Sequence, residues 1–248
     1  MNTRPLHFFF RPAVLAACMA VVCHLYAAQP EAVPGAPAET PVLVLPDGGK
    51  YYGPLKDGLL DGTGRIVWNE LRRYEGAFHH GRMEGQGTLT LAYGVYQGLF
   101  KDGDLNGPGR YASKDGEVYE GNFVDGEYDG QGVLSGNNGN RYEGRFEKGQ
   151  FVRGTLTDAS GQTMTGPFKN FQANGLMEAT YPGGVVFKGE MRDGEFKGKG
   201  ELRLADGKRI RADFDGSGAD EGEIDYPNGD RYTGALYAAA AYGKGRMV

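Results

Sequence analysis

Aromatic, glycine and charged residues alternate along short stretches of this chain, and the alternation recurs at a fixed interval. The clearest stretch, Tyr119 to Leu134, reads Tyr-Glu-Gly-Asn-Phe, then Val-Asp-Gly, then Glu-Tyr-Asp-Gly-Gln-Gly-Val-Leu. With Gly121 as the marker, the same position falls at residues 53, 76, 98, 121, 144, 166, 189, 212 and 234. The steps are 22 or 23 residues, and a period of this size is typical of repeat proteins.

Each unit predicts two short strands. In the first strand, as in Tyr74 to Phe78, alternate residues share a face, so ring, glycine and ring lie on one side and the glutamate faces water. The second strand reads Gly-x-Gly-x-apolar, and both glycines are expected on the packing face, where rings of a neighbouring strand can lie flat against the backbone. The glycines predicted to have this structural role include Gly76, Gly98, Gly121, Gly144, Gly130 and Gly132.

Asp-Gly and Asn-Gly pairs separate the units, for example at residues 115–116, 138–139 and 206–207. These pairs accept the positive φ of tight hairpin turns. The predicted fold is therefore all-β: an elongated single-layer antiparallel meander of β-hairpin repeats, with about nine copies of 22–23 residues. A single hairpin cannot bury its apolar face alone, so stability is expected from stacking on neighbours.

The combined pattern of Tyr-Glu-Gly-x-Phe, x-Asp-Gly and Gly-x-Gly-x-apolar resembles the MORN repeat (membrane occupation and recognition nexus), over roughly residues 42–248. The resemblance implies a β-sheet that acts as a scaffold, a dimer module or a membrane-surface module. Some copies depart from the pattern. Phe171 stands where the turn glycine belongs, Ala212 replaces the marker glycine, and residues 238–241 are all alanine where the last turn is expected.

Residues 1–28 do not belong to the array and have the pattern of a secretory signal peptide. Arg4 and Arg11 precede a mostly apolar run, and Ala27-Ala28 predicts cleavage near residue 28. Retention as an N-terminal anchor in the inner membrane and lipoprotein processing at Cys18 stay open as alternatives. Residues 29–40 are predicted to be a Pro/Ala-rich linker and residues 41–248 the repeat array, in an exported bacterial protein of the periplasm or cell envelope.

Charge and cysteine content restrict the partners and the chemistry. The formal net charge is −5, from 27 basic and 32 acidic residues, and removing residues 1–28 takes away two arginines, which leaves 25 against 32, or −7. Mild acidity argues against nucleic acid as a partner. Both cysteines, Cys18 and Cys23, lie in the predicted signal peptide, so the processed chain is expected to have no disulfide and no thiolate site.

No pattern of catalytic or metal-binding residues emerges. His79 and His80 are neighbours in a predicted strand and would point to opposite faces, so a turn before Gly81 is favoured over a metal site. Ser217 lies between glycines but lacks a nucleophile elbow, and no phosphate-binding loop motif occurs. The sequence therefore predicts no enzyme activity, no cofactor and no metal; a small envelope enzyme with an unrecognised site is the lowest alternative.

Recurring rings are the remaining candidates for binding. Most are expected to pack on glycines, but a single-layer sheet has little else to cover them, so a partly open aromatic groove is predicted as a possible binding site. Its rings are Tyr74, Phe78, Tyr96, Phe100, Tyr119, Phe123, Tyr142 and Phe146. The expected partner is a protein or a second copy of the chain, in a non-catalytic scaffold role. The alternative is a phospholipid-headgroup module, although the negative net charge weakens attraction to anionic lipid.

Overall fold

A computed structural model describes residues 40–216 and 218–248. The predicted signal peptide, nearly all of the predicted linker, and Ser217 lie outside the described residues. The described part of the chain is built from strands and contains no helix, and so none with the length and apolar character of a membrane span. It divides into two compact units, with the boundary between Asp129 and Gly130.

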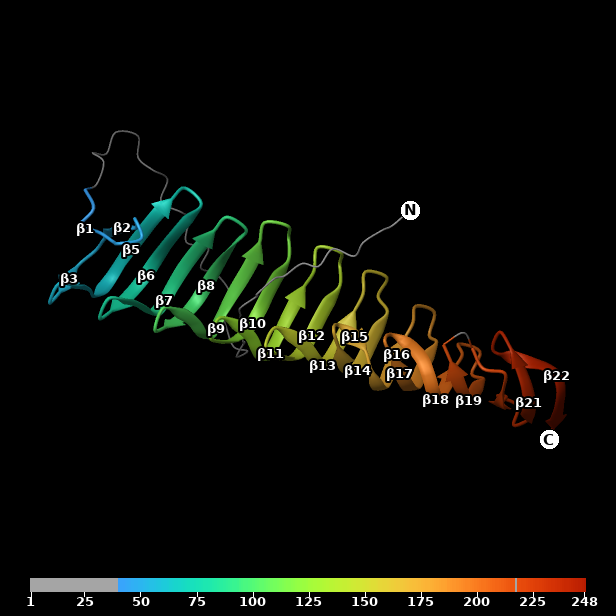
Figure 1. Cartoon of the computed structure of the whole chain (residues 1–248). Helices are drawn as coiled ribbons and strands as arrows, with labels where there is room; N and C mark the ends of the chain where they lie inside the picture. Colours follow the sequence, from blue (N-terminus) through green and yellow to red (C-terminus); the bar gives the residue numbers. More distant parts are fainter. Residues whose placement is uncertain (1–39, 217) are drawn as a thin grey trace, which may run out of the picture. The chain divides into compact units, whose positions relative to one another are not determined.

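In the first unit, successive strands pair in sequence order and every pairing is antiparallel, as in the left part of Figure 1. These strands are β1 (Leu43–Val44), β2 (Lys50–Tyr52), β5 (Gly62–Asn69), β6 (Arg72–His79), β7 (Arg82–Leu91), β8 (Gly94–Lys101), β9 (Asp104–Ser113) and β10 (Val118–Val124). A separate short hairpin joins β3 (Leu55–Lys56) to β4 (Leu59–Leu60).

The second unit by itself has the same antiparallel succession of hairpins. Its strands are β11 (Glu127–Ser135), which begins in the first unit, β12 (Arg141–Glu147), β13 (Gln150–Thr157), β14 (Thr163–Lys169), β15 (Gln172–Ala173), β16 (Gly175–Thr180), β17 (Val186–Arg192), β18 (Glu195–Arg203), β19 (Arg209–Asp215), β20 (Glu221–Asp225), β21 (Arg231–Tyr237) and β22 (Ala240–Met247). The short strand β15 pairs only with β14. The predicted meander of β-hairpin repeats is thus confirmed.

Two kinds of turn join the strands. Two-residue turns with positive φ at both positions close one set of hairpins, as in His80-Gly81 (φ 47° and 83°) and Asp102-Gly103 (53° and 100°). This is the turn whose twist matches that of the flanking strands. Longer loops close the other set, and most of them contain one positive-φ glycine. Gly139 of the predicted Asn-Gly turn has φ 82° and donates its N–H to the carbonyl of Gly136 over 3.1 Å.

The turn glycine is absent from two of these tight turns, yet the turns still form. Phe171 has φ 62° and Ala239 has φ 61°, a region that residues with a side chain rarely adopt. Phe171 gains a compensating contact, because its ring meets that of Tyr142 edge-on at 5.3 Å between centroids. The methyl side chain of Ala239 cannot make a comparable ring contact.

One residue per strand, in most strands a glycine, forms a row within each unit, called here the glycine row. In the first unit the register joins Gly64, Gly76, Gly87, Gly98, Gly109 and Gly121. In the second unit the register joins one run, Gly132, Gly144, Gly154 and Gly166, and a second run, Met177, Gly189, Gly200, Ala212, Gly222, Gly234 and Gly245. The pairing of β14 with β16 ends one residue before Gly166 and Met177, at Thr165 and Glu178. A methyl group at Gly87 would lie 2.3–2.6 Å from ring atoms of Tyr74, so the predicted packing of rings on glycine holds here.

The first glycine of the Gly-x-Gly pair does something else, and the prediction that both glycines lie under rings is wrong at this position. Gly85 and Gly130 have φ 80° and 90°. Gly85 lies where the register between β6 and β7 slips, since Gly76 faces Gly87 but Phe78 faces Met83. A bulge of this kind breaks the strict alternation of faces. This glycine therefore allows the positive φ of the bulge, and no ring packs against it.

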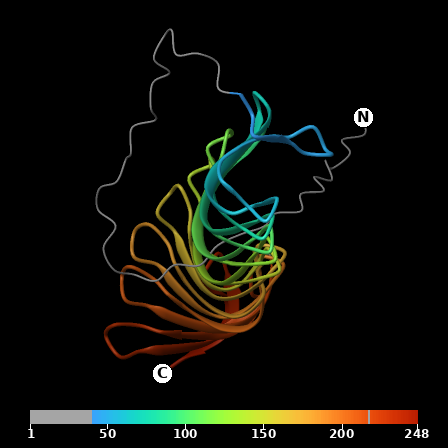
Figure 2. The ribbon, with the colours of Figure 1, turned by 90° about the vertical axis from the view of Figure 1, so that its left-hand side faces the viewer.

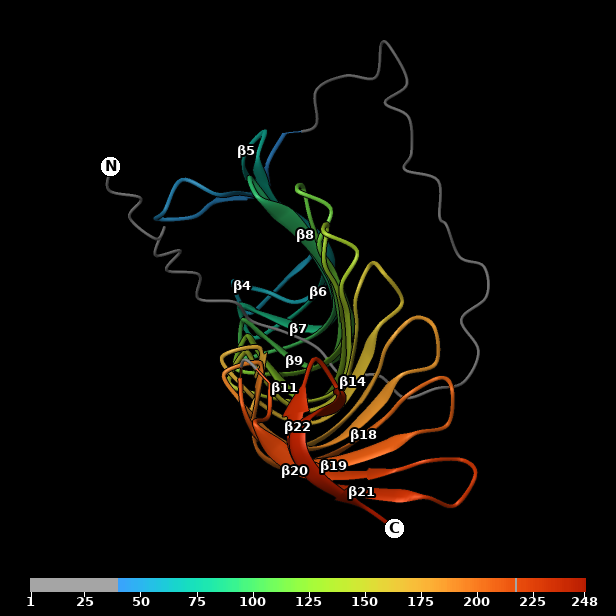
Figure 3. The ribbon, with the colours of Figure 1, turned by 90° about the vertical axis from the view of Figure 1, so that its right-hand side faces the viewer.

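Aromatic rings form the core of the first unit and touch across neighbouring hairpins. Tyr74 is fully buried and meets Phe78 and Phe100 edge-on at 5.1 and 5.0 Å, while Tyr51 meets Phe78 at 5.2 Å. Such edge-to-face pairs are favourable beyond the area that they bury. The strands that carry these rings are curved, as Figures 2 and 3 show for the hairpins of each unit. Towards the end of the second unit the core becomes aliphatic, with Ile210 and Ile224 each 1% exposed.

Candidate functional site

The rings predicted to line an aromatic groove belong to the core. Seven of the eight are no more than 6% exposed: Tyr74, Phe78, Tyr96, Phe100, Tyr119, Phe123 and Phe146. Tyr142, the eighth, is half-buried and covered in part by Phe171 and Phe151. The prediction of an open groove is therefore wrong for these seven rings. Rings of adjacent strands cover one another and pack against the backbone of the glycine row.

Several core tyrosines also have a structural role that the sequence did not indicate. The hydroxyl groups of Tyr51, Tyr74 and Tyr232 each donate a hydrogen bond to the carbonyl three residues ahead, at 2.9, 3.0 and 2.9 Å. The acceptor of the Tyr74 bond is Ala77, which the register slip leaves without a facing residue on β7, while Thr63 of β5 faces it on the other side. The hydroxyl thus ties the buried ring to the backbone at the bulge. Burial raises the pKa of Tyr74 to about 12.

The opposite face of the sheet is polar, because residues on either side of the glycine row point away from the rings. In the second unit, the residues on one side of the glycine row form a second row, called here the charged ladder. Each of its residues faces the corresponding residue of the next strand. Its members in register order are Glu143, Thr155, Thr165, Glu178, Lys188, Glu201, Arg211, Glu223, Thr233 and Arg246. Facing charges are opposite along its middle, and Lys188 Nζ lies 2.9 Å from Glu178 Oε1.

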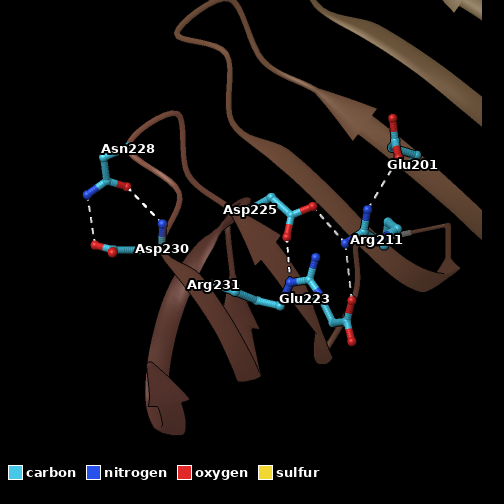
Figure 4. Close-up of polar contacts among 7 residues, drawn as sticks. All are labelled: Glu201, Arg211, Glu223, Asp225, Asn228, Asp230 and Arg231. Carbon is cyan, nitrogen blue, oxygen red and sulfur yellow. Dashed lines mark hydrogen bonds and ion pairs between the residues drawn. The ribbon is translucent and has the colours of Figure 1, made fainter. Parts of the chain in front are cut away.

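Arg211 is the most highly connected member of the charged ladder (Figure 4). Its guanidinium reaches Glu201 at 3.8 Å, Glu223 at 3.3 Å and Asp225 at 2.7 Å. Asp225 accepts a second hydrogen bond from Arg231 Nε, also 2.7 Å long. Hydrogen bonds from Arg231 and then Arg211 hold the pKa of Asp225 below its usual value, and the bond to Asp225 is the main reason that the pKa of Arg211 is raised.

Between this ladder and the other flanking row lies an open groove, called here the polar groove. Its floor is the backbone of the glycine row, at Gly166, Met177, Gly189, Gly200 and Ala212. One wall is the charged ladder from Thr165 to Glu223, and the other includes Arg153, Leu176, Lys199 and Asp213. Leu176 is 73% exposed, which makes it a solvated apolar side chain within a charged surface. A floor without bulky groups lets a ligand backbone come close to the sheet.

In the first unit, two loops lack the usual Asx-Gly sequence. One joins β5 to β6 and the other joins β7 to β8. They border a shallow pocket that includes Leu71, Leu91 and Tyr93. Leu71 is 54% and Tyr93 51% exposed, and Arg72 stacks over the ring of Trp68 at 4.1 Å. These loops therefore present apolar groups together with a cation.

The histidine pair lies at a tight turn, as predicted, but the argument that the two side chains point apart is wrong. The His79 and His80 ring centroids are 4.0 Å apart, because positive φ at His80 ends the strand alternation. Asp61 lies 3.1 Å from His79 Nδ1 and accepts the backbone N–H of His80. Among the described residues, no group of three or more His, Cys, Asp or Glu is arranged to hold a metal ion.

Two-stranded units repeated every 22 or 23 residues, with a glycine row and rings packed on it, define an antiparallel β-hairpin repeat protein. The chain belongs to the MORN-repeat family. Five segments match the MORN repeat: residues 74–92, 96–118, 119–141, 142–163 and 187–209. Hairpins outside these segments keep the strand pairing while their sequences diverge. MORN repeats are typically protein- or membrane-binding modules.

The chain is similar to a small part of alsin from Homo sapiens and Mus musculus. The identity is 37% over 81 residues, which is 30% of this chain but 5% of alsin. Among solved structures it is similar to the SAS-4 (dCPAP) TCP domain of Drosophila melanogaster, with 17% identity, coverage of 62% of this chain and 85% of that one, and a TM-score of 0.40. The TCP10 domain of CPAP from Danio rerio gives 15% identity, 77% and 81% coverage, and a TM-score of 0.28. Structural likenesses of this size carry no functional argument.

Proposed function

We propose that this chain is a non-catalytic protein-binding scaffold whose polar groove receives an extended segment of a partner protein. The observation that carries the proposal is the groove itself, with a floor of glycine backbone, charged walls and the exposed side chain of Leu176. The repeat family supports the same class of function, since MORN repeats are typically binding modules.

The charges of the groove favour specific recognition of a partner over non-specific attraction to charged surfaces. Most of them already have opposite neighbours, as Arg211 does with Glu201 and Glu223, so the net field of the groove is small. Exposed ion pairs add little stability by themselves. They do impose electrostatic complementarity on a partner, which contributes to specificity and to the association rate.

A single introduced thiol can test the groove. In a full-length chain with Cys18 and Cys23 replaced by serine, Lys199→Cys places one cysteine in the groove wall, and Lys244→Cys places one at an exposed position of β22 in the same unit. After labelling with a benzophenone maleimide and irradiation in envelope extract, the groove position is expected to give a discrete cross-linked partner and the control position none. Equal cross-linking from both positions, or none from position 199, would exclude the groove as the binding site.

We further propose that the protein is exported to the periplasm or cell envelope. The support is the basic flank, apolar run and Ala27-Ala28 of the sequence. Mass spectrometry of the native protein is expected to find a mature N-terminus within a few residues of Gln29. Acylation at Cys18 would instead make it a lipoprotein, and an intact N-terminus in the membrane fraction would make it an anchored protein.

A second candidate function, binding to a lipid surface, is favoured by the exposed Leu71 and Tyr93 beside Arg72. Apolar groups and a cation at one edge fit a membrane interface. The negative net charge opposes adsorption to anionic lipid. Co-sedimentation with phosphatidylcholine vesicles, with and without phosphatidylserine, separates the two functions, because the scaffold is expected to stay in the supernatant.

A further inference from the structure

Two arginines face each other across the strands at one end of the polar groove. Arg145 of β12 and Arg153 of β13 are directly opposite in register, and both are exposed. Like charges at facing positions destabilise a sheet. The fold therefore retains a local arrangement that opposes its own stability.

The surroundings of this arginine pair do not neutralise it fully. Arg145 has one partner, Glu147 on its own strand at 2.9 Å. Arg153 has no acidic partner among the residues that the structure describes. The next residues across the sheet on either side are Gln131 and Pro167, neither of which is charged.

Another pair of facing arginines shows the contrast. Arg203 faces Arg209, but the next residue across from Arg209 is Asp225. Asp225 forms its ion pairs with Arg211 and Arg231, so the two pairs differ only in the residues across the sheet. A carboxylate faces Arg209, whereas Gln131 and Pro167 face Arg145 and Arg153.

Arg153 takes the place that Gln131 has in the preceding copy, one position before the second glycine of the pair, so its place in the groove wall follows from the repeat. What differs in this copy is the bulge. Gly154 comes five positions after Gly149, whereas Gly132 comes six positions after Gly126, and the first glycine of the Gly-x-Gly pair is missing. The register slips by one residue, since Arg145 faces Arg153 while Phe146 faces Phe151, and Phe151 stays in the core.

We infer that the arginine pair binds a carboxylate of the partner, and that Leu176 receives an apolar side chain of the same extended segment. The inference rests on the proposed function and specifies the partner: a peptide with an acidic residue followed by an apolar residue. Arginine presents a planar fork of donors that matches a carboxylate. A bound anion would also remove the repulsion between the two guanidinium groups.

Strand spacing sets the distance between the two contacts. Arg153 faces Pro167 on β14, and β16, which carries Leu176, pairs with the other side of β14. Two steps of ~4.8 Å between strands give ~10 Å. Alternate residues of an extended chain share a face, so two side chains that both enter the groove lie two positions (~7 Å) or four positions (~13 Å) apart. An acidic residue with an apolar residue two positions away fits, because the long arginine and glutamate side chains span the remaining ~3 Å.

The test is a titration of the full-length chain with acetyl-Ser-Glu-Ser-Leu-Ser-amide, followed by NMR of arginine side-chain N–H signals. Saturable shifts of Arg145 and Arg153 are expected. Arg153→Gln is expected to weaken binding by ~10-fold or more, as for loss of a hydrogen bond to a charged group. Arg153→Lys should have an intermediate effect, because it keeps the charge and loses the fork. The matched control Arg203→Gln, on the same face, should leave the affinity unchanged.

Two further peptides complete the experiment. Replacing the glutamate by lysine should abolish binding, and replacing the leucine by alanine should weaken it in the wild-type chain. Circular dichroism of Arg153→Gln should show an unchanged or higher midpoint of unfolding, since a like-charge contact is removed. No saturable shift with the acidic peptide, or equal affinity of wild type and Arg153→Gln, would overturn the inference. Cross-linking from position 199, together with equal affinity of wild type and Arg153→Gln for the acidic peptide, would leave the groove as a binding site and reject only the carboxylate contact.

Discussion

A methyl group added at Gly87 tests whether the glycine row exists to receive rings. In Gly87→Ala the new Cβ would lie 2.3, 2.6 and 2.6 Å from three atoms of Tyr74. Ordinary contacts between carbon atoms are ~3.5–4.0 Å, so the overlap is about 1 Å or more. Tyr74 cannot easily move aside, because it is fully buried and wedged edge-on between Phe78 and Phe100.

The expected loss follows from this geometry. Overpacking of a filled core costs typically ~1–3 kcal/mol, and a locked ring places this site near the upper end, at about 3 kcal/mol. The backbone of Gly87 lies outside the positive-φ region, so the cost is steric. Gly58→Ala provides the matched control: its φ is 78° and nothing lies within 4 Å of the new methyl group. Its cost is that of backbone strain, about 1 kcal/mol.

Urea unfolding followed by circular dichroism measures both losses as free energies of unfolding, with the slope of each transition checked for a common two-state process. Combining Gly87→Ala with Tyr74→Leu should recover part of the loss, and the coupling between the two sites should be ~0.5–3 kcal/mol. If Gly87→Ala costs no more than Gly58→Ala, or if the two sites show no coupling, rings do not depend on the glycine row.

Three other changes probe features outside the glycine row. Tyr74→Phe should cost ~0.5–1.5 kcal/mol in the same urea assay, because the carbonyl of Ala77 loses its hydrogen bond; a neutral effect would contradict the assigned role of the hydroxyl. Ala239→Gly should stabilise the chain by up to ~1 kcal/mol, since φ 61° is strained for alanine; a lower midpoint in thermal unfolding would count against this. Asp225→Asn should reduce the loss in free energy of unfolding that accompanies a fall from neutral to acidic pH. The folded-state pKa of Asp225 is lowered mainly by Arg231, so its contribution is present above the unfolded pKa and is lost as pH falls through the folded pKa; an identical pH dependence in both proteins would exclude it.

Much of the fold could be predicted from the sequence because its determinants are local. The period follows from the marker glycines, and hairpin turns follow from pairs such as Asp102-Gly103, which adopt the positive φ that their residue types allow. The turn at Ala238-Ala239 forms without a glycine because the strands on either side pair in the same way as in other copies. Neighbouring strands can thus impose a turn that the local sequence does not favour.

The candidate site was harder to predict because it depends on which face remains open. The alternation rule correctly placed Tyr74 and Phe78 on one face, but the expectation of an open aromatic surface assumed that a single layer cannot cover its own rings. Rings of successive hairpins cover one another in the structure, with centroids ~5 Å apart. The rule also fails at bulges, which is why the role of Gly85 was missed. Arg153 was missed because alternation places it on the polar face without showing which residues face it across the sheet.

Binding specificity in such a fold is expected to reside where the repeats differ. A residue under a ring must be nearly the same in every copy, because each hairpin makes the same contact with its neighbour; Gly87 is such a residue. A residue of the polar face has no neighbour that dictates its identity, so position 153 can hold an arginine where the preceding copy has Gln131. The fold tolerates that change because an exposed like-charge pair costs only a few tenths of a kcal/mol to ~1 kcal/mol. That is far less than the ~3 kcal/mol expected at the glycine row. The difference lets the polar face vary from repeat to repeat while the ring face keeps the hairpins stacked, which is the division of roles that recognition of a particular partner by a repeat protein requires.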